Sequence, residues 1–167
     1  MRRLIRAIGL VIALVPAAAP ADPASAAAVE AFIHEGLPFF ASRVPAKKLR
    51  SLAELKRETV TQEQNKFDES QTDAVHLFEY TGMRVWLLCA PAKSDNCMLI
   101  EVTLSRPKQK AKYGLTVGAT AKFLETTLGA PGSIEGAQWV YRGESSEVLF
   151  TLKNGLVKEI QWNLYTG

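Results

Sequence analysis

The sequence has few of the side chains on which enzymes and metal sites depend. Its 167 residues include two cysteines and two histidines, and the histidines, His34 and His76, are far apart in the chain. His34 and Glu35 begin like a zinc-protease motif, but Pro38 stands where the second histidine ligand would be. We find no G-x-S-x-G, no phosphate-binding loop and no dinucleotide fingerprint. We therefore expect no catalytic residue, no metal, no cofactor and no enzymatic activity.

The sequence also has little net charge. Its formal charge of +3 is accounted for by Arg2, Arg3 and Arg6, so the rest of the chain is neutral. One short basic strip contains Arg106, Lys108, Lys110 and Lys112. Because no aromatic residues are interleaved with these bases, the strip favours a solvated connector over a nucleic-acid site. We expect no nucleic-acid partner.

Long hydrophobic runs are missing outside the N-terminus. Residues 1–21 combine a basic start, a short apolar run and an Ala/Pro-rich end, which is typical of a secretory signal peptide. The small-x-small rule allows cleavage after Ala21 or after Ala26, and the distance from the apolar run favours Ala21. The run is too short to span a bilayer as a mature helix. We therefore expect an exported, periplasmic protein without a membrane span.

The two cysteines predict a disulfide bond. Cys89 and Cys97 flank the turn-forming segment 91–96, which lies between two apolar runs. In an exported protein this arrangement is typical of a disulfide across a hairpin. A redox-active pair is disfavoured because there is no C-x-x-C motif. Neither cysteine closely follows the N-terminal apolar run, so we also expect no lipid anchor.

Paired carboxylates occur in the polar loop that contains Asp68, Glu69 and Asp73. A glycosidase would place such a pair across an apolar cleft and raise one pKa. In a polar loop both carboxylates stay ionised, so a solvated loop is favoured over a glycosidase pair or a weak calcium site.

The pattern of apolar residues predicts three helices and six strands. The helices are expected over 27–40, interrupted by Gly36 and Pro38, over 46–58, and over 120–128, where Thr120 is a candidate cap and Gly129 a stop. The strands are expected over 74–80, 83–90, 98–105, 138–142, 147–153 and 156–164.

The two halves of this pattern resemble each other, which indicates an internal repeat. Phe78–Gly82 matches Trp139–Gly143, and similar matches follow in the next two strands. We predict an α+β fold, an antiparallel sheet with helices packed on one face, in which a helix-plus-three-strand unit is used twice. The units are 46–112 and 113–167, preceded by an N-terminal helical segment over 22–45.

Strand alternation predicts which side chains share a face. A disulfide across the hairpin places Val85, Leu87 and Leu99 beside Cys89 and Cys97. The opposite face carries Trp86, Leu88, Met98, Ile100, Val102 and Leu104, and we expect it to receive the helix.

The face with the disulfide would then be the outer one, yet Val85, Leu87 and Leu99 are too apolar to be left in water. Two coverings are possible. One is the chain's own N-terminal segment, with Phe32, Ile33, Leu37, Phe39 and Phe40. The other is a partner protein.

The last hairpin allows the same alternation test. Val148, Phe150 and Leu152 share a face with Ile160, Trp162 and Leu164 if the turn over 153–155 has three residues, with a glycine in the left-handed region and a bulge. The other face of this hairpin is polar and suits solvent.

Residues 113–167 resemble a known module. The resemblance rests on Tyr113–Pro131, Trp139–Tyr141, Val148–Phe150 and Asn154–Ile160. They resemble the small outer-membrane lipoprotein family of the barrel-assembly machine (the SmpA/OmlA-like module), which is similar in fold to secreted β-lactamase-inhibitor proteins that use the unit twice. The resemblance implies proteins that bind other proteins and do no chemistry. This chain departs from the family because it lacks the lipid-attachment cysteine.

We therefore expect a non-catalytic periplasmic protein-binding or envelope-scaffold module whose partner is another envelope or exported protein. An alternative is a secreted or periplasmic inhibitor of a hydrolase, which would use an exposed loop. The candidate partner-binding residues are Val85, Leu87, Leu99, Lys93, Asp95 and Asn96.

Overall fold

The computed structural model describes residues 23–37, 43–108 and 111–164. The expected signal peptide, 1–21, lies outside the described residues. The helices are α1 (Pro23–Glu35), α2 (Ala46–Arg50) and α3 (Ala121–Leu128), with a single turn η1 (Lys112–Gly114). The strands are β1 (Arg43–Val44), β2 (Leu55–Gln64), β3 (Thr72–Tyr80), β4 (Met83–Cys89), β5 (Cys97–Leu104), β6 (Ser133–Glu135), β7 (Gln138–Arg142), β8 (Glu147–Lys153) and β9 (Leu156–Asn163).

The predicted α+β fold, with a layer of helices on one face, is wrong, because the described chain is mostly antiparallel sheet with a small helical part. The expected helix 46–58 ends at Arg50. Glu54 then adopts a left-handed φ of 69°, which breaks helical geometry. Beyond it, Thr59-Val60-Thr61 is a β-branched run that favours extended backbone, and the segment becomes β2.

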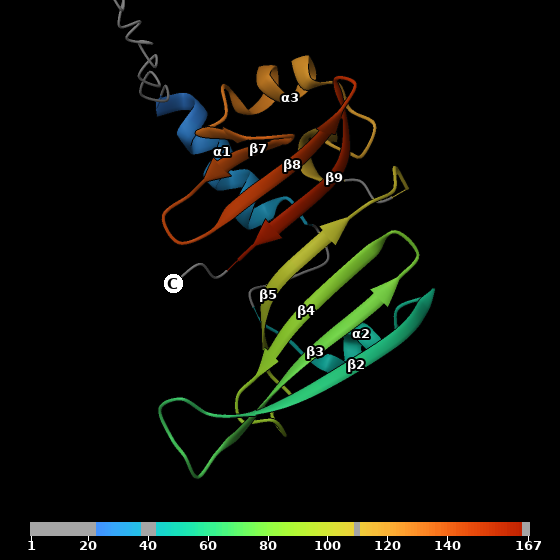
Figure 1. The fold of residues 1–167 in the computed structure, drawn as a ribbon, viewed down its shortest axis with the longest axis vertical. Helices are drawn as coiled ribbons and strands as arrows, with labels where there is room; N and C mark the ends of the chain where they lie inside the picture. The colour runs from blue at the N-terminus through green and yellow to red at the C-terminus, as the bar shows by residue number, and fades with distance from the viewer. Residues whose placement is uncertain (1–22, 38–42, 109–110, 165–167) are drawn as a thin grey trace, which may run out of the picture.

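The sheet consists of two meanders joined edge to edge. The strand order is β2-β3-β4-β5-β9-β8-β7-β6, and β1 pairs with β5. Figure 1 shows α2 beside the half that contains β2–β5, and α1 and α3 beside the half that contains β7–β9. Each half therefore contains a short helix followed by four strands, so the repeated element has one strand more than predicted.

Two tyrosines at matching positions of the two halves each hold the end of a helix. The Tyr80 hydroxyl on β3 donates to the carbonyl oxygen of Leu49 in α2 at 2.7 Å. The Tyr141 hydroxyl on β7 donates to the carbonyl oxygen of Gly129, which caps α3, at 3.0 Å. Burial raises the pKa of Tyr80 to about 12 and also raises that of Tyr141, so both remain protonated donors.

The structure inverts the predicted faces of the first half. Val85 and Leu87 are fully buried and Leu99 is 2% exposed, in one core with Cys89 and Cys97. The same core includes Val44 of β1, which pairs with the end of β5, and Leu49 of α2, which packs against β3. The chain thus covers this face itself.

The opposite, open face of β4 and β5 carries Trp86, Leu88, Met98 and Ile100, all half-buried. Val102 and Leu104, predicted to share it, are instead in the core. The cause is a bulge: Trp86 pairs with Glu101 and Leu87 pairs with Leu99, so Ile100 is an extra residue. One inserted residue moves every later side chain to the other face.

The last hairpin has the predicted faces but a different turn. Phe150 pairs with Ile160 and Val148 with Trp162, all four of them buried. The turn, however, has two residues, Asn154 and Gly155, with φ of 55° and 71°, as a tight hairpin turn requires. A bulge beside the turn compensates for the missing turn residue: Leu152 pairs with Val157 and Thr151 with Glu159, so one residue of β9 is extra. The side chains beyond the bulge therefore share the predicted face.

Helix α1 covers the second half, not the first. The Phe32 ring lies 5.4 Å from the Trp162 ring and 5.9 Å from the Phe150 ring, measured between centroids. Ile33 is also buried there in the common core, and Leu37 is partly buried against it. Phe39 and Phe40, the other residues predicted to cover the first half, lie outside the described residues.

Helix α3 matches its prediction at both ends. The Thr120 hydroxyl accepts a hydrogen bond from the Phe123 backbone N–H at 3.1 Å, and Gly129 ends the helix with a φ of 80°. Across the described ranges, none of the helices has the length and apolar character needed to cross a bilayer.

The predicted disulfide is confirmed: Cys89 and Cys97 are bonded, with their Cα atoms 4.2 Å apart. Replacing both cysteines by alanine frees the unfolded chain from this crosslink, and we expect the free energy of unfolding to fall by roughly 2–3 kcal/mol. Urea unfolding of the double variant beside the oxidised parent measures the loss. An unchanged unfolding midpoint would show that the crosslink contributes nothing to stability.

Candidate functional site

The structure divides the predicted partner-binding residues into two groups. Val85, Leu87 and Leu99 are core residues, so no partner can reach them without unfolding the first half. Lys93, Asp95 and Asn96 are exposed in the turn between β4 and β5. In that turn the Asp95 carboxylate lies 3.7 Å from the ammonium of Lys47, which ties the turn loosely to α2.

The open face of the first half carries the apolar side chains that a partner could reach. We call them the outer strip: Val75 and Leu77 on β3, Trp86 and Leu88 on β4, and Met98 and Ile100 on β5, all half-buried. The same face of the second half is mostly polar, with Glu147, Thr151, Glu159, Gln161 and Asn163. A solvated antiparallel sheet alternates apolar and polar residues, and the outer strip breaks that rule.

Part of the outer strip forms the floor of a groove of about 540 Å³. The floor consists of Val75, Leu88, Met98 and Ile100. One wall is the end of the β2–β3 hairpin, residues 63–67, which extends past the end of β4. The groove is thus apolar below and polar at one side.

The loop at the end of this hairpin presents Phe67 to solvent, with 98% of the residue exposed. The Asn65 side-chain oxygen accepts hydrogen bonds from the backbone N–H groups of Phe67 and Asp68, at 2.8 and 2.9 Å. Asp68 in turn accepts from the Ser70 N–H at 3.0 Å and hydroxyl at 2.6 Å. These bonds, with one from Gln71, lower the Asp68 pKa. The loop is therefore pre-ordered around an exposed aromatic ring.

Asp73 places a carboxyl group with one buried oxygen beside the groove. Its Oδ2 accepts a hydrogen bond from the Asn65 amide at 2.7 Å, whereas its buried Oδ1 accepts none from any residue that the structure describes. A buried acceptor without a donor costs free energy, and the cost is larger for a charged group. Glu63 lies directly opposite on β2, so two acids face each other across the strands.

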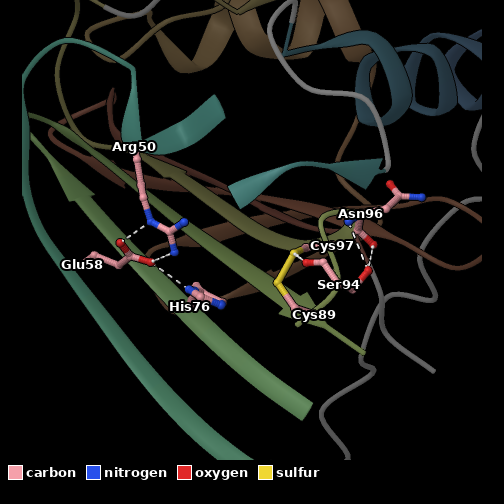
Figure 2. The surroundings of a disulfide bond; sticks show 7 residues. All are labelled: Arg50, Glu58, His76, Cys89, Ser94, Asn96 and Cys97. Atoms are coloured by element: carbon pink, nitrogen blue, oxygen red, sulfur yellow. Dashed lines mark hydrogen bonds and ion pairs between the residues drawn. A yellow bond between two sulfur atoms is a disulfide. The ribbon is translucent and has the colours of Figure 1, made fainter. Parts of the chain in front are cut away.

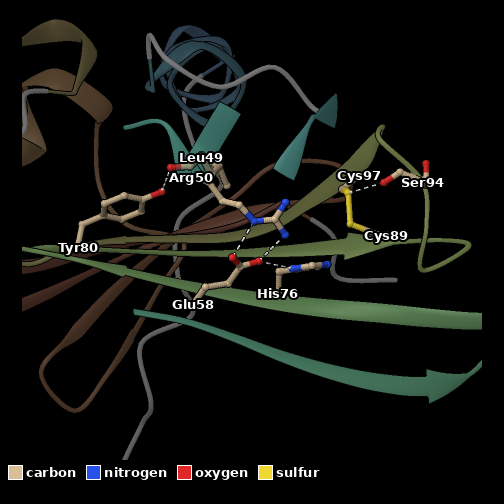
Figure 3. Close-up of polar contacts among 8 residues, drawn as sticks. All are labelled: Leu49, Arg50, Glu58, His76, Tyr80, Cys89, Ser94 and Cys97. Atoms are coloured by element: carbon tan, nitrogen blue, oxygen red, sulfur yellow. Dashed lines mark hydrogen bonds and ion pairs between the residues drawn. A yellow bond between two sulfur atoms is a disulfide. The ribbon is translucent and has the colours of Figure 1, made fainter. Parts of the chain in front are cut away.

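A second polar cluster lies on the covered face, and Figures 2 and 3 show it between α2 and the sheet. The Arg50 guanidinium donates to both oxygens of the Glu58 carboxylate at 2.7 Å, and His76 Nδ1 lies 2.8 Å from Glu58 Oε1. The hydrogen bonds from Arg50 and His76 lower the Glu58 pKa against the opposing effect of burial. A histidine oriented by a carboxylate can serve as a base, but His76 is 6% exposed, so the cluster acts as a clamp between α2 and the sheet.

The other histidine is exposed. His34 Nε2 lies 2.7 Å from Glu30 on the same helix, so the two histidines of the chain belong to separate clusters. Sequence reasoning missed both the groove and the clamp. The clamp was missed because the 46–58 segment was predicted as one helix, which hides the approach of Arg50 to Glu58.

The fold and the site define an antiparallel β-sheet protein with a disulfide-linked hairpin and an apolar groove on its open face. No protein-family model matches the sequence, and no curated protein matches it. Among solved structures, the chain is similar to the uncharacterized protein YfeY from Escherichia coli, with a TM-score of 0.44 and 14% sequence identity. The match covers 78% of this chain and 97% of that one.

The clamp predicts a pH-dependent contribution to stability. Because the Glu58 pKa is lower in the folded state, its contribution is present above the unfolded-state pKa, about 4.3, and is lost as the pH falls through the folded-state value. We expect Glu58→Gln to lower the free energy of unfolding by about 1 kcal/mol at pH 7 and by less at pH 3.

Thermal unfolding of the variant and the parent between pH 3 and pH 7 measures this difference. Glu144→Gln, at an exposed turn residue of the second half, is the control, and we expect it to leave stability unchanged. A Glu58→Gln effect that is the same at both pH values would contradict the ionic origin of the clamp.

Proposed function

We propose that this protein is a non-catalytic binding module of the periplasm that docks a segment of another exported or envelope protein in the groove on its open face. The observation that supports this proposal is the half-exposed outer strip beside the exposed, pre-ordered Phe67. Contiguous apolar surface on a folded protein is typical of interaction sites. Aromatic residues beside it often contribute most of the binding free energy.

The groove suggests the chemistry of its occupant. Its floor of Val75, Leu88, Met98 and Ile100 suits one or two apolar side chains. At its wall, Asp73 Oδ1 is an acceptor without a donor among the described residues. A segment that places an apolar side chain next to an amine, guanidinium or amide would therefore fill the groove and satisfy the carboxylate.

Two further features support the periplasm as the place of action. The disulfide between Cys89 and Cys97 suits an oxidising compartment, and residues 1–21 have the pattern of a signal peptide. Cleavage after Ala21 would leave α1 whole, whereas cleavage after Ala26 would remove its first turn. The resemblance of residues 113–167 to a protein-binding envelope module also agrees with a role without chemistry.

A second candidate function is inhibition of an exported hydrolase. It is favoured by the Phe67 loop, because a pre-ordered loop that presents one exposed aromatic side chain is suited to entering a cleft.

The docking proposal predicts where a partner will be crosslinked. A photo-reactive amino acid in place of Phe67 or Leu88 should yield a discrete protein adduct in cells that export the chain. The same amino acid at Leu149, half-buried on the open face of the second half, should yield none. Gel analysis and mass spectrometry identify the adducts. Equal labelling at Leu88 and Leu149, or no adduct at any position, would contradict docking in the groove.

Inhibition has its own test. We would incubate the purified protein with exported hydrolases, beginning with lysozymes and β-lactamases, and measure their rates. If the loop inhibits, Phe67→Ala should weaken inhibition at least about tenfold while the melting temperature stays the same, because the side chain is already in water. Unchanged rates with the parent protein would remove these enzymes as targets.

A further inference from the structure

The outermost strand of the first half has one edge with no strand beside it in the described part of the chain. β2 (Leu55–Gln64) is the last strand in the order of the sheet and, among the described residues, pairs only with β3. Figure 1 shows it as the free lower border of the sheet along its whole length. Such an edge presents unpaired backbone N–H and C=O groups and is a template for another strand.

The direction of those groups follows from the ladder with β3. The Asn65 N–H donates to the Gln71 carbonyl oxygen at 3.1 Å, so the backbone of Asn65 faces the β3 side. The register is unbroken from Arg57 to Gln64, and backbone groups alternate in direction along an antiparallel strand. The groups that face away from β3 therefore belong to Glu58, Val60, Gln62 and Gln64.

We propose that the occupant of this edge is a second copy of the chain, whose β2 pairs antiparallel with the first around a two-fold axis at Val60. This places Val60 opposite the same residue of the other copy, and Glu58 opposite Gln62. All of these have outward-facing backbone groups, so they can exchange hydrogen bonds. The interface is self-complementary, as two-fold symmetry requires.

Charge complementarity selects this register. With the axis at Val60, Arg57 of each copy lies opposite Glu63 of the other, and no like charges oppose each other over residues 57–63. An axis at Thr59 places Arg57 opposite Thr61, and an axis at Thr61 places it opposite Asn65. Shifts that pair an outward-facing residue with an inward-facing one break the hydrogen-bond pattern. An axis at Arg57 pairs Lys56 with Glu58 but places Arg57 opposite itself. Within β2, the Val60 register therefore forms ion pairs without opposing like charges.

Glu63 and Val60 gain in this register what the single chain does not give them. Glu63 faces Asp73 on β3, an acid opposite an acid, whereas Arg57 faces Glu79. Arg57 of the other copy would offset that repulsion. Val60 is 47% exposed, and its apolar side chain would be covered by its counterpart.

Charged residues on an edge strand usually prevent such pairing. Here the charges at the two ends of the register, Arg57 and Glu63, are opposite in sign. Charges that disfavour pairing with other strands therefore favour pairing with a second copy of β2. The pairing goes beyond the proposed docking function, because it uses the edge of the sheet and not its open face.

Sedimentation velocity over a range of concentrations tests the pairing with purified protein. We expect the parent to dimerise. Arg57→Glu alone and Glu63→Arg alone should each weaken dimerisation at least about tenfold, since each places like charges opposite each other twice. The double variant should dimerise like the parent. An equimolar mixture of the two single variants should form a heterodimer, because every opposed pair in it is again of opposite sign.

Val60→Pro is an independent variant. It removes an N–H that faces away from β3, so the fold should be retained while the central hydrogen-bond pair of the dimer is lost. The melting temperature of every variant is measured in parallel, and only folded variants are compared. A parent that stays monomeric throughout the concentration range, or single charge reversals that dimerise like the parent, would overturn the proposal.

Discussion

The architecture depends on which face of the sheet carries the Cys89–Cys97 disulfide. Both cysteines are in the core, so alternation along β4 and β5 places Val85, Leu87 and Leu99 there too. Their burial requires a cover, and β1 and α2 contribute Val44 and Leu49 to it. The same alternation leaves Trp86, Leu88 and Met98 on the open face. The covered core and the exposed outer strip are thus two consequences of one constraint.

The helices are short, and tertiary contacts hold them in place. α2 has five residues, too few to be stable in isolation, and it is held by the Tyr80 hydroxyl at Leu49 and by the Arg50–Glu58–His76 clamp. α3 has its own N-cap at Thr120 and is joined to the sheet by Tyr141 at its C-terminal end. The use of one tyrosine contact in both halves is the clearest sign that the halves are built alike.

The groove exists because the β2–β3 hairpin is longer than the strands beside it. Its end continues past β4 and turns the flat outer strip into a concave site with a polar wall. This hairpin contains the ordered Asn65–Asp68 turn. It also contains Asp73 Oδ1 and the outer edge of β2, which have no partner within residues 23–37, 43–108 and 111–164. Both proposed interactions, docking on the face and pairing at the edge, therefore involve one element.

Several features of this protein follow from the sequence by itself, because they depend on local chemistry or strand period: the disulfide, most strand positions, the cap and stop of α3, and which residues share a face over a few positions.

The predicted α+β class and the predicted identity of the covered face were wrong. Alternation along a strand predicts which side chains share a face of the sheet, but it does not predict which of the two faces is buried. That choice was decided by distant segments, since α2 packs over β3 and β1 pairs with the end of β5. The bulges at Ile100 and near Glu159 also contribute, because they shift the parity where no local signal marks them. The groove and the clamp join residues from separate strands, so only the tertiary structure could reveal them.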